Sequence, residues 1–556
     1  MCGILGSNVN RDNFFDALKI IEHRGPDNIE YKRVDNFLFG HVRLAIIDLE
    51  TEANQPMEFD NIVIIFNGEI YNYKELIKEF DLNCITTSDT EVLIRLYQKF
   101  GFEFLKYLNG MFSFSIFDKT EKLIFFARDR FGKKPFYYYH KNGNFIFASE
   151  IKAILKLLDK KPDLNLNAFS EYLSFMTPLN DTFYDGISKL KAGYGGVFRD
   201  GKIELEKYYD LDNIKTTIFD EKKAIFKIEE TLLKSIKYRL TSDVEVASLL
   251  SGGVDSSLIA AIYTKFSNKK INTFSIGYDE YKHYDELSYA KIVSKHINSN
   301  HHEITISQRD FIETIDNTII HFDEPLGDSA SIPTYILSKY IHNKYIKVAL
   351  SGEGSDELFL GYDYYFKVLK YSKNYSSMAN YLSNNYNNLL LKKNIDFKFP
   401  YDNKNFSSTN WLSYIDLKIW ISEVLMSKVD RMSMANSLEL RSPFLDYNLV
   451  ELSFKIDEKI KKGDTNKYLI KKIANKYLPK EIVHRDKKGF SFPFIEWLYD
   501  EYGDEILNLF NRVNAKSNLF NPEFLKFLYN EGKERRLKQS VWNLYIFCRW
   551  YEKNYL

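Results

Sequence analysis

The feature that most constrains the fold is a change of pattern near residue 205. Before it, short β-branched or aromatic runs such as "IVIIFNG" and "GMFSFSIFD" are bounded by Gly, Asn and Asp. After it, apolar strands alternate with helices, as in "EVASLL" followed by "SGGVDSSLIAAIYTKF". The first pattern predicts an α+β, mostly antiparallel unit, and the second predicts a parallel, doubly wound sheet. Because 556 residues exceed what one hydrophobic core can hold, we expect two domains, 2–205 and 206–556.

Composition excludes several classes of protein. Lys+Arg and Asp+Glu both number 76, so no net charge attracts nucleic acid or an anionic membrane. The three cysteines, Cys2, Cys84 and Cys548, are too few and too scattered for a disulfide framework or a zinc site. The sequence shows neither a secretory leader nor an apolar stretch long enough to span a membrane. We therefore expect a cytoplasmic protein.

Two further segments bear on the fold. From about residue 410 onward the pattern is mainly helical.

Residues 196–202 fit G-x-x-x-x-G-K, the start of a phosphate-binding loop, but Ile203 stands where Ser or Thr is needed. Asp200-Gly201 is also a hairpin turn signal between two strand-like runs. We therefore expect a β-hairpin here.

The stretch "LLSGGVDSS" predicts a nucleotide site. An apolar strand leads to Ser251, Gly252 and Gly253, and a helix is expected to begin at about Val254. Glycines and a helix N-terminus suit a phosphate group. Asp255 stands beside this position, and a carboxylate repels a phosphate unless a divalent cation separates them. The loop therefore predicts a magnesium-bound phosphate.

A second loop follows the same logic. "VALSGEGSDE" places Ser351 and Gly352 after a strand, and Glu353, Asp356 and Glu357 at a helix start. The two loops would meet where parallel sheets bind ligands, at the carboxyl ends of the strands. The alternative is that both are ordinary capped helix starts with acidic first turns.

These motifs resemble a known family. "SGGVDSS" is similar to the pyrophosphate loop of ATP pyrophosphatases, and "SGEGSDELFLGY" and "KVDRMSMANSLELRSPFLD" resemble glutamine-dependent asparagine synthetases. The resemblance implies that an acid is activated with ATP as an acyl-adenylate, which ammonia then converts to an amide. It implies magnesium ligands at Asp255 and Asp356. It implies an ATP site made of Leu249, Ser251, Gly252, Gly253, Asp255, Ser256, Ser257, Ile276, Ser351, Gly352 and Glu353.

"HRDKKGF" also matches the family, and the resemblance implies that Lys487 lies against the phosphates and the reacting acyl group. An ammonium group there can neutralise charge that develops on the leaving phosphate. Lys488 is adjacent, so the assignment between the two lysines stays open, and a solvated basic turn is the alternative.

The first half offers an ammonia source. If Met1 is removed, Cys2 carries both a thiol and an α-amine, the arrangement of N-terminal nucleophiles. "MCGILG", "HRGPD", "RLAIID", "NGEIYN" and "SDTE" resemble class II glutamine amidotransferases, which implies an N-terminal-nucleophile αββα sandwich. The resemblance implies an oxyanion hole at Asn67 and Gly68.

Free glutamine is a zwitterion, so its recognition needs both signs of charge. Arg43 suits the α-carboxylate, and Glu69 and Asp89 suit the α-ammonium, with Asn67 also at the substrate. Ser88 and Glu91 have capping-box spacing, so Asp89 can equally be a helix-start residue.

The sequence thus predicts an ATP-dependent carbon–nitrogen ligase of amino-acid biosynthesis. Cys2 would release ammonia from L-glutamine, and the second half would use it with MgATP to convert L-aspartate to L-asparagine. The resemblance also implies an internal ammonia tunnel and favours a homodimer. Ser442 stands where the family pattern has Val, which leaves the acceptor open: a sugar acid or a peptide is the alternative. A non-catalytic glutamine sensor or a tRNA-modifying enzyme fits less well, because the motifs are intact and the charge is balanced.

Overall fold

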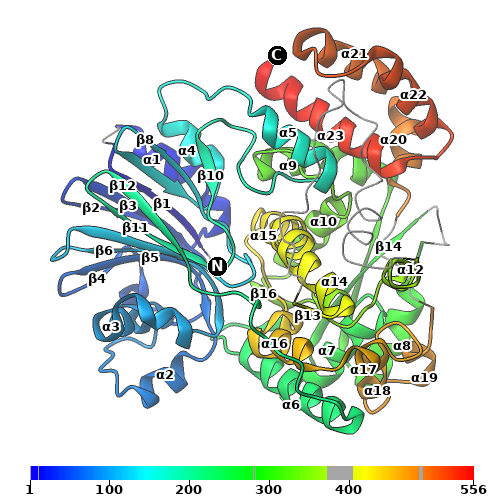
Figure 1. The fold of residues 1–556 in the computed structure, drawn as a ribbon, viewed down its shortest axis with the longest axis horizontal. Coiled ribbons are helices and arrows are strands. Elements are labelled where there is room, and N and C mark those ends of the chain that lie inside the picture. The colour runs from blue at the N-terminus through cyan, green and yellow to red at the C-terminus, as the bar shows by residue number, and fades with distance from the viewer. Residues whose placement is uncertain (1, 10–11, 280, 282–283, 372–404, 487–491) are drawn as a thin grey trace.

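The computed structural model describes residues 2–9, 12–279, 281, 284–371, 405–486 and 492–556. The N-terminal half contains two antiparallel sheets of six strands each (Figure 1). The first sheet has the order β10 (Ile187–Lys189), β8 (Tyr137–Lys141), β9 (Asn144–Ala148), β1 (Gly3–Ser7), β3 (Phe37–Arg43) and β2 (Asn28–Val34). The second has the order β12 (Lys202–Lys207), β11 (Tyr194–Arg199), β7 (Leu123–Arg128), β6 (Gly110–Asp118), β5 (Ile62–Ile70) and β4 (Met57–Phe59).

The two sheets face each other across an aromatic-rich core. Ile4 and Phe39 from the first sheet meet Ile65 and Phe126 from the second, and all four are buried. Helices α1 (Phe14–Lys19) and α4 (Ile151–Leu157) pack on the first sheet, while α3 (Asp89–Phe100), with α2 (Tyr73–Glu79) beside it, packs on the second. A further helix is α5 (Leu166–Phe175). The predicted αββα sandwich is confirmed.

The hairpin prediction at Asp200-Gly201 is also confirmed. β11 and β12 pair as antiparallel neighbours on either side of this turn, in which both residues have positive φ, +53° and +76°. The G-x-x-x-x-G-K pattern therefore lies in a β-hairpin, whereas a phosphate-binding loop connects a strand to a helix.

The C-terminal half is built on a parallel sheet. Its order is β15 (Asn300–Ile306), β14 (Asn272–Tyr278), β13 (Val246–Leu249), β16 (Val348–Leu350) and β17 (Glu439–Arg441). The order reverses between β13 and β16, and the two glycine-containing loops follow these two strands. Such a switch point opens a crevice at the carboxyl ends of the strands.

Helices cover the parallel sheet and form the rest of this half. Those described up to residue 371 are α6 (Glu221–Arg239), α7 (Val254–Thr264), α8 (Leu287–Ile297), α9 (Gln308–Phe322), α10 (Ser331–His342), α11 (Ser355–Leu358) and α12 (Asp363–Tyr371). After residue 405 come α14 (Ser408–Asp416), a π-helical stretch (Leu417–Leu425), α15 (Met426–Met434), α16 (Tyr447–Lys455), α17 (Glu458–Lys462), α18 (Tyr468–Ala474), α19 (Lys480–Val483), α20 (Phe494–Tyr502), α21 (Glu505–Ser517), α22 (Pro522–Lys533) and α23 (Lys538–Tyr555). The expected helical C-terminal part is confirmed, apart from strand β17. In the described ranges, no helix is long and apolar enough to cross a membrane.

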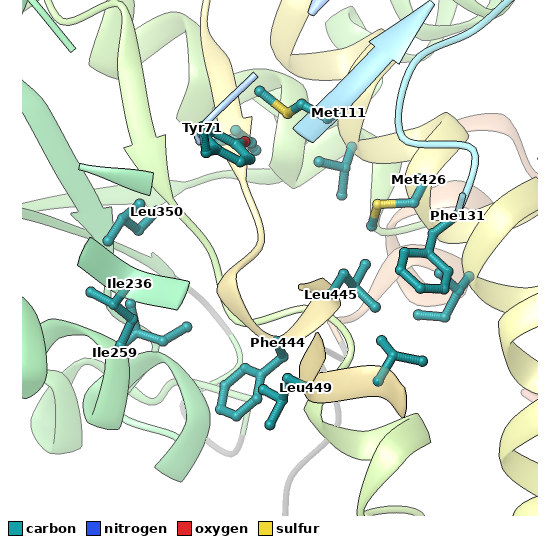
Figure 2. Close-up of a cluster of buried hydrophobic side chains, with 14 of the residues drawn as sticks. Tyr71, Met111, Phe131, Ile236, Ile259, Leu350, Met426, Phe444, Leu445 and Leu449 are labelled. Carbon is teal, nitrogen blue, oxygen red and sulfur yellow. The ribbon is translucent and has the colours of Figure 1, made fainter. Parts of the chain in front are cut away.

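The two halves share one apolar cluster, which Figure 2 shows in part. Tyr71 and Met111 come from the N-terminal half, whereas Leu350, Met426 and Phe444 come from the other. All five side chains are buried. Because burial of apolar area is the main favourable term in association, this cluster fixes the halves against each other.

Candidate active sites

Cys2 is held by the fold on both sides of its backbone. Its amide nitrogen lies 3.2 Å from Oδ1 of Asn67, and its carbonyl oxygen accepts a 3.0 Å hydrogen bond from Nε of Arg24. The Cys2 side chain is buried. A residue at the second position of a chain is normally frayed. Here the contacts place the thiol at a defined point beside β1.

A small cavity opens at this thiol. The predicted glutamine-site residues that line it are Cys2, Arg43, Gly68, Glu69 and Asp89. Cys2 directly precedes β1, and the others come from β3, β5 and α3, so the set spans 87 positions of the sequence, from Cys2 to Asp89. The fold therefore brings the predicted set together around the one thiol.

The thiol needs a base. Burial raises the pKa of Cys2 above its ordinary value, so the thiolate is scarce at neutral pH. The α-amine that Cys2 gains when Met1 is removed would sit on the same residue and titrate at about 7.7–8.0. It is thus the nearest group that can take the thiol proton near neutral pH.

Donors for an oxyanion adjoin Cys2. Nδ2 of Asn67 is buried and has no hydrogen-bond partner among the described residues. Gly68 lines the cavity, and a side chain on it would place Cβ 2.1 Å from the carbonyl oxygen of Met111. Only glycine therefore lets β5 approach β6 this closely while it presents its backbone to the cavity.

Two carboxyl groups face the same cavity. Burial raises the pKa of Glu69 well above its ordinary value and that of Asp89 to about 7. Oδ2 of Asp89 accepts a 2.8 Å hydrogen bond from the Ile70 amide, whereas Oε2 of Glu69 has no such partner in the part of the chain described. A cationic ligand in the cavity would favour the charged forms of both carboxyl groups.

Arg43 supplies a cationic side chain to the cavity wall. Its Nη1 donates to the Glu50 carbonyl oxygen at 2.8 Å and to Oδ1 of Asn54 at 2.6 Å, and its Nη2 bonds the Asp48 carbonyl oxygen. These bonds fix the guanidinium in the cavity wall, and they also hold the 48–54 loop.

The capping-box pattern at Ser88 is only half formed. Ser88 does precede α3, and its Oγ accepts from the Thr90 amide at 3.2 Å. The Glu91 carboxylate instead accepts from the amides of Ile85 and Thr86. The reciprocal bond was predicted wrongly, because the preceding loop offers Glu91 nearer donors.

The first nucleotide loop has the predicted form, with α7 beginning at Val254. Gly252 has φ +75°, and a Cβ there would lie 2.6 Å from Cβ of Tyr289. The Ser251 amide donates to Oγ of Ser256 at 3.1 Å, which closes the loop onto the first turn of the helix.

A cavity of about 580 Å³ lies at the ends of β13, β14 and β16. The predicted ATP-site residues that line it are Leu249, Ser251, Gly253, Asp255, Ser256, Ile276, Gly352 and Glu353, and the predicted metal ligand Asp356 lies in the same wall. Gly252, Ser257 and Ser351 are not part of its wall as described. The volume is in the range of small-molecule sites.

Lys467 was missed by sequence reasoning. This residue precedes α18, and its Nζ contacts Oδ2 of Asp255 and lies 2.7 Å from Oδ1 of Asp356. Those carboxylates raise the pKa of Lys467 although burial opposes the charge. "DTNKYL" carries no pattern that marks it, because its position depends on the chain folding back onto the two loops.

The carboxylates of Asp255 and Asp356, which Lys467 contacts, are suitable ligands for a magnesium ion. Asp255 and Asp356 both line the cavity and converge on one cation, and Oδ1 of Asp255 has no hydrogen-bond partner in the described ranges. Carboxylate oxygens beside a phosphate site are the donors that Mg²⁺ takes. The donor set therefore fits a divalent cation.

The "HRDKKGF" segment is only partly described. Lys487 and Lys488 lie outside the described residues. Arg485 of the same motif donates to the Gly252 carbonyl oxygen at 3.0 Å, pairs with Glu286 and lines the large cavity. The motif thus reaches the nucleotide loop through a residue that the sequence reasoning did not single out.

Strand β17 lies between the two cavities. Nη2 of Arg441 lies 3.5 Å from Oε1 of Glu69, which lines the small cavity at Cys2. Leu440, its neighbour in the strand, lines the large cavity. Because side chains alternate along a strand, β17 presents one face to each site.

Comparison with known proteins agrees with this arrangement. Residues 227–552 match the asparagine synthase family, and residues 1–209 match the glutamine amidotransferase domain. The chain is 31% identical to asparagine synthetase [glutamine-hydrolyzing] 1 of Bacillus subtilis, over 96% of this chain and 93% of that protein. It is 41% identical to putative asparagine synthetase [glutamine-hydrolyzing] 2 of Methanocaldococcus jannaschii, over 65% of this chain and 76% of that protein. It is also 26% identical to amidase chyE of Penicillium rubens, over 91% and 88%.

Proposed function

The chain belongs to the family of glutamine-hydrolysing asparagine synthetases, and we propose how its two cavities divide that reaction. The enzyme is an ATP-dependent ligase that makes asparagine with nitrogen from glutamine. The cavity at Cys2 hydrolyses glutamine, and the cavity at the ends of the parallel strands uses ATP. The observation that carries this division is β17, which contacts both cavities in one folded unit.

At the first cavity, the Cys2 thiol attacks the side-chain amide carbon of glutamine after its α-amine takes the proton. Asn67 Nδ2 and the Gly68 amide stabilise the oxyanion. Arg43 holds the α-carboxylate, while Glu69 and Asp89 hold the α-ammonium. Ammonia leaves, and water then releases glutamate from the thioester.

At the second cavity, the side-chain carboxylate of aspartate attacks the α-phosphate of ATP. Residues Ser251 to Ser257 hold the leaving pyrophosphate, and Leu249 and Ile276 contact adenosine. Asp255 and Asp356 would hold Mg²⁺, which supplies charge neutralisation at the phosphates when bound. Lys467 lies at the same carboxylates and stabilises the charge that develops as pyrophosphate leaves. Lys487 remains a second candidate for that role.

The amide-forming step then needs ammonia and a base. The nitrogen lone pair attacks the acyl carbon, the bond to AMP breaks, and one proton must leave the nitrogen. Glu353 lines the large cavity and bonds Ser442, the residue after Arg441. This contact links the Glu353 carboxylate to the residue that follows β17, and we assign it the proton. Ammonia would pass inside the interface, near β17.

The acceptor is tested by product mass. Purified enzyme receives ATP, Mg²⁺ and glutamine with aspartate, glutamate, a uronic acid or a short acidic peptide, one at a time. We expect asparagine, AMP and pyrophosphate with aspartate alone. An amide formed on another acid, without asparagine, would establish the alternative acceptor. Relatives named asparagine synthetase, which match over most of the chain, do not favour that outcome.

Three further properties follow as proposals from the family alone: Mg²⁺ as the metal, a cytoplasmic location and a homodimer. Omission of Mg²⁺ with EDTA present should abolish pyrophosphate release but leave glutamine hydrolysis. Light scattering of the purified protein decides between monomer and dimer.

A further inference from the structure

The segment after β17 places a hydroxyl group between the two sites. β17 pairs in parallel with β16, with Leu350 opposite Arg441. Arg441 faces Glu69 of the glutamine cavity, and Leu440 lines the nucleotide cavity. Ser442 follows Arg441 directly after the end of β17.

Ser442 makes two side-chain contacts there. Its Oγ lies 3.2 Å from Oγ of Ser351, and it donates to Oε2 of Glu353 at 3.5 Å. The partner strand ends are themselves fixed, because the Ser351 amide donates to the Arg441 carbonyl oxygen at 2.9 Å. Ser442 is only 5% exposed. The hydroxyl therefore lies beside Ser351 and within hydrogen-bond distance of the Glu353 carboxylate.

A buried hydroxyl is costly unless it is bonded. Leu440, Phe444 and Leu445, which are close to Ser442 in the sequence, are buried apolar residues. A serine in this place is explained if its hydrogen bond to Glu353 has a function.

We propose that Ser442 is a positioning residue for amide formation, whose hydroxyl orients the Glu353 carboxylate in the wall of the nucleotide cavity. This inference rests on the proposed function, in which Glu353 takes a proton from the attacking nitrogen. Ser442 itself touches neither substrate. Its effect should therefore appear in the step that uses ammonia, and not in glutamine hydrolysis or ATP binding.

The test compares Ser442→Thr with Ser442→Val. The two side chains have the same shape, and only Thr keeps the hydroxyl. With ammonium, aspartate and MgATP, we expect kcat/KM for ammonium to fall about tenfold in the Val variant, as for loss of a hydrogen bond to a charged group. The Thr variant should stay within about twofold of wild type. KM for ATP and glutaminase activity should be unchanged in both.

With glutamine as the nitrogen source, the Val variant should release more glutamate than asparagine, whereas the Thr variant should keep the two nearly equal.

Ser453→Ala is a matched control, because Ser453 is a buried serine whose Oγ donates to the Val450 carbonyl oxygen within α16. If either β-branched variant fails to fold, Ser442→Ala is compared with wild type by the same measurements.

Equal rates in the Thr and Val variants, or an unimpaired Ala variant, would overturn the inference. Failure of the proposed function looks different: the wild-type enzyme itself would then make no asparagine from ammonium.

Discussion

Nη2 of Arg24 lies 2.9 Å from Oδ2 of Asp430, and both side chains are buried. The pair crosses from the N-terminal half to α15. Nε of Arg24 also donates to the Cys2 carbonyl oxygen, and Asp430 lies 3.1 Å from Nζ of Lys134. Burial alone would raise the pKa of Asp430, but Arg24 and Lys134 hold it below its ordinary value. The backbone of the proposed nucleophile is thus tied to the other half of the molecule.

This relationship predicts the effect of Asp430→Asn. Loss of the carboxylate leaves Arg24 and Lys134 without their shared counter-charge, which typically costs about 3–5 kcal/mol in a buried network. We expect a lower melting temperature and, below it, a glutaminase kcat/KM reduced about tenfold through misplacement of Cys2. Glu552→Gln is the control, since its Arg512 pair is largely exposed. Full glutaminase activity in a destabilised Asp430→Asn enzyme would show that the tie does not position the thiol.

The Lys467→Met variant tests whether the Lys467 ammonium group contributes to synthesis in the nucleotide cavity. Removal of the ammonium that Asp255 and Asp356 share should lower ammonium-driven synthesis by about a hundredfold or more, as for other groups that stabilise a developing charge. Glutaminase activity should not change. Lys472→Met alters an exposed lysine on the same helix and should behave as wild type. Equal loss in both lysine variants would point to damage of α18 and not to phosphate chemistry.

The glutamine cavity predicts a pH dependence. Burial raises the pKa of Asp89 to about 7, so its carboxyl group is neutral below that pH and charged above it. Attraction of the α-ammonium is therefore lost as the pH falls, and KM for glutamine should rise by up to about tenfold per pH unit below 7. Ammonium-driven synthesis should lack this dependence. If KM for glutamine does not change with pH in the wild type, or changes with pH to the same extent in Asp89→Asn, then titration of Asp89 does not control glutamine binding.

Most of the architecture followed from local pattern. Alternating strands and glycine turns predicted both sheet types, and α7 begins at Val254 as expected because the glycine turn marks the end of the strand. β17 was not predicted: Glu439–Arg441 is a short segment in a helical region, and its pairing with β16 gives it its strand form. A segment of that length carries no periodicity of its own.

The candidate sites divide in the same way. Residues in quoted motifs, such as Asp255 and Asp356, were placed in advance and lie at one cavity. Asp430 and Arg441 lie in a motif quoted for the family resemblance but received no role, and Lys467 lies in no quoted motif, because the partners of all three are more than a hundred residues away in sequence. Only the folded chain brings those partners into contact.

The most direct measurement concerns Cys2→Ala. The purified variant is given aspartate and MgATP with either glutamine or ammonium, and asparagine is quantified by mass. Glutamine-driven synthesis should fall by at least about a thousandfold, because the nucleophile is gone. Ammonium-driven synthesis should stay within about twofold of wild type, since the second cavity is intact. Parallel loss of both activities would contradict the division of the reaction between two sites.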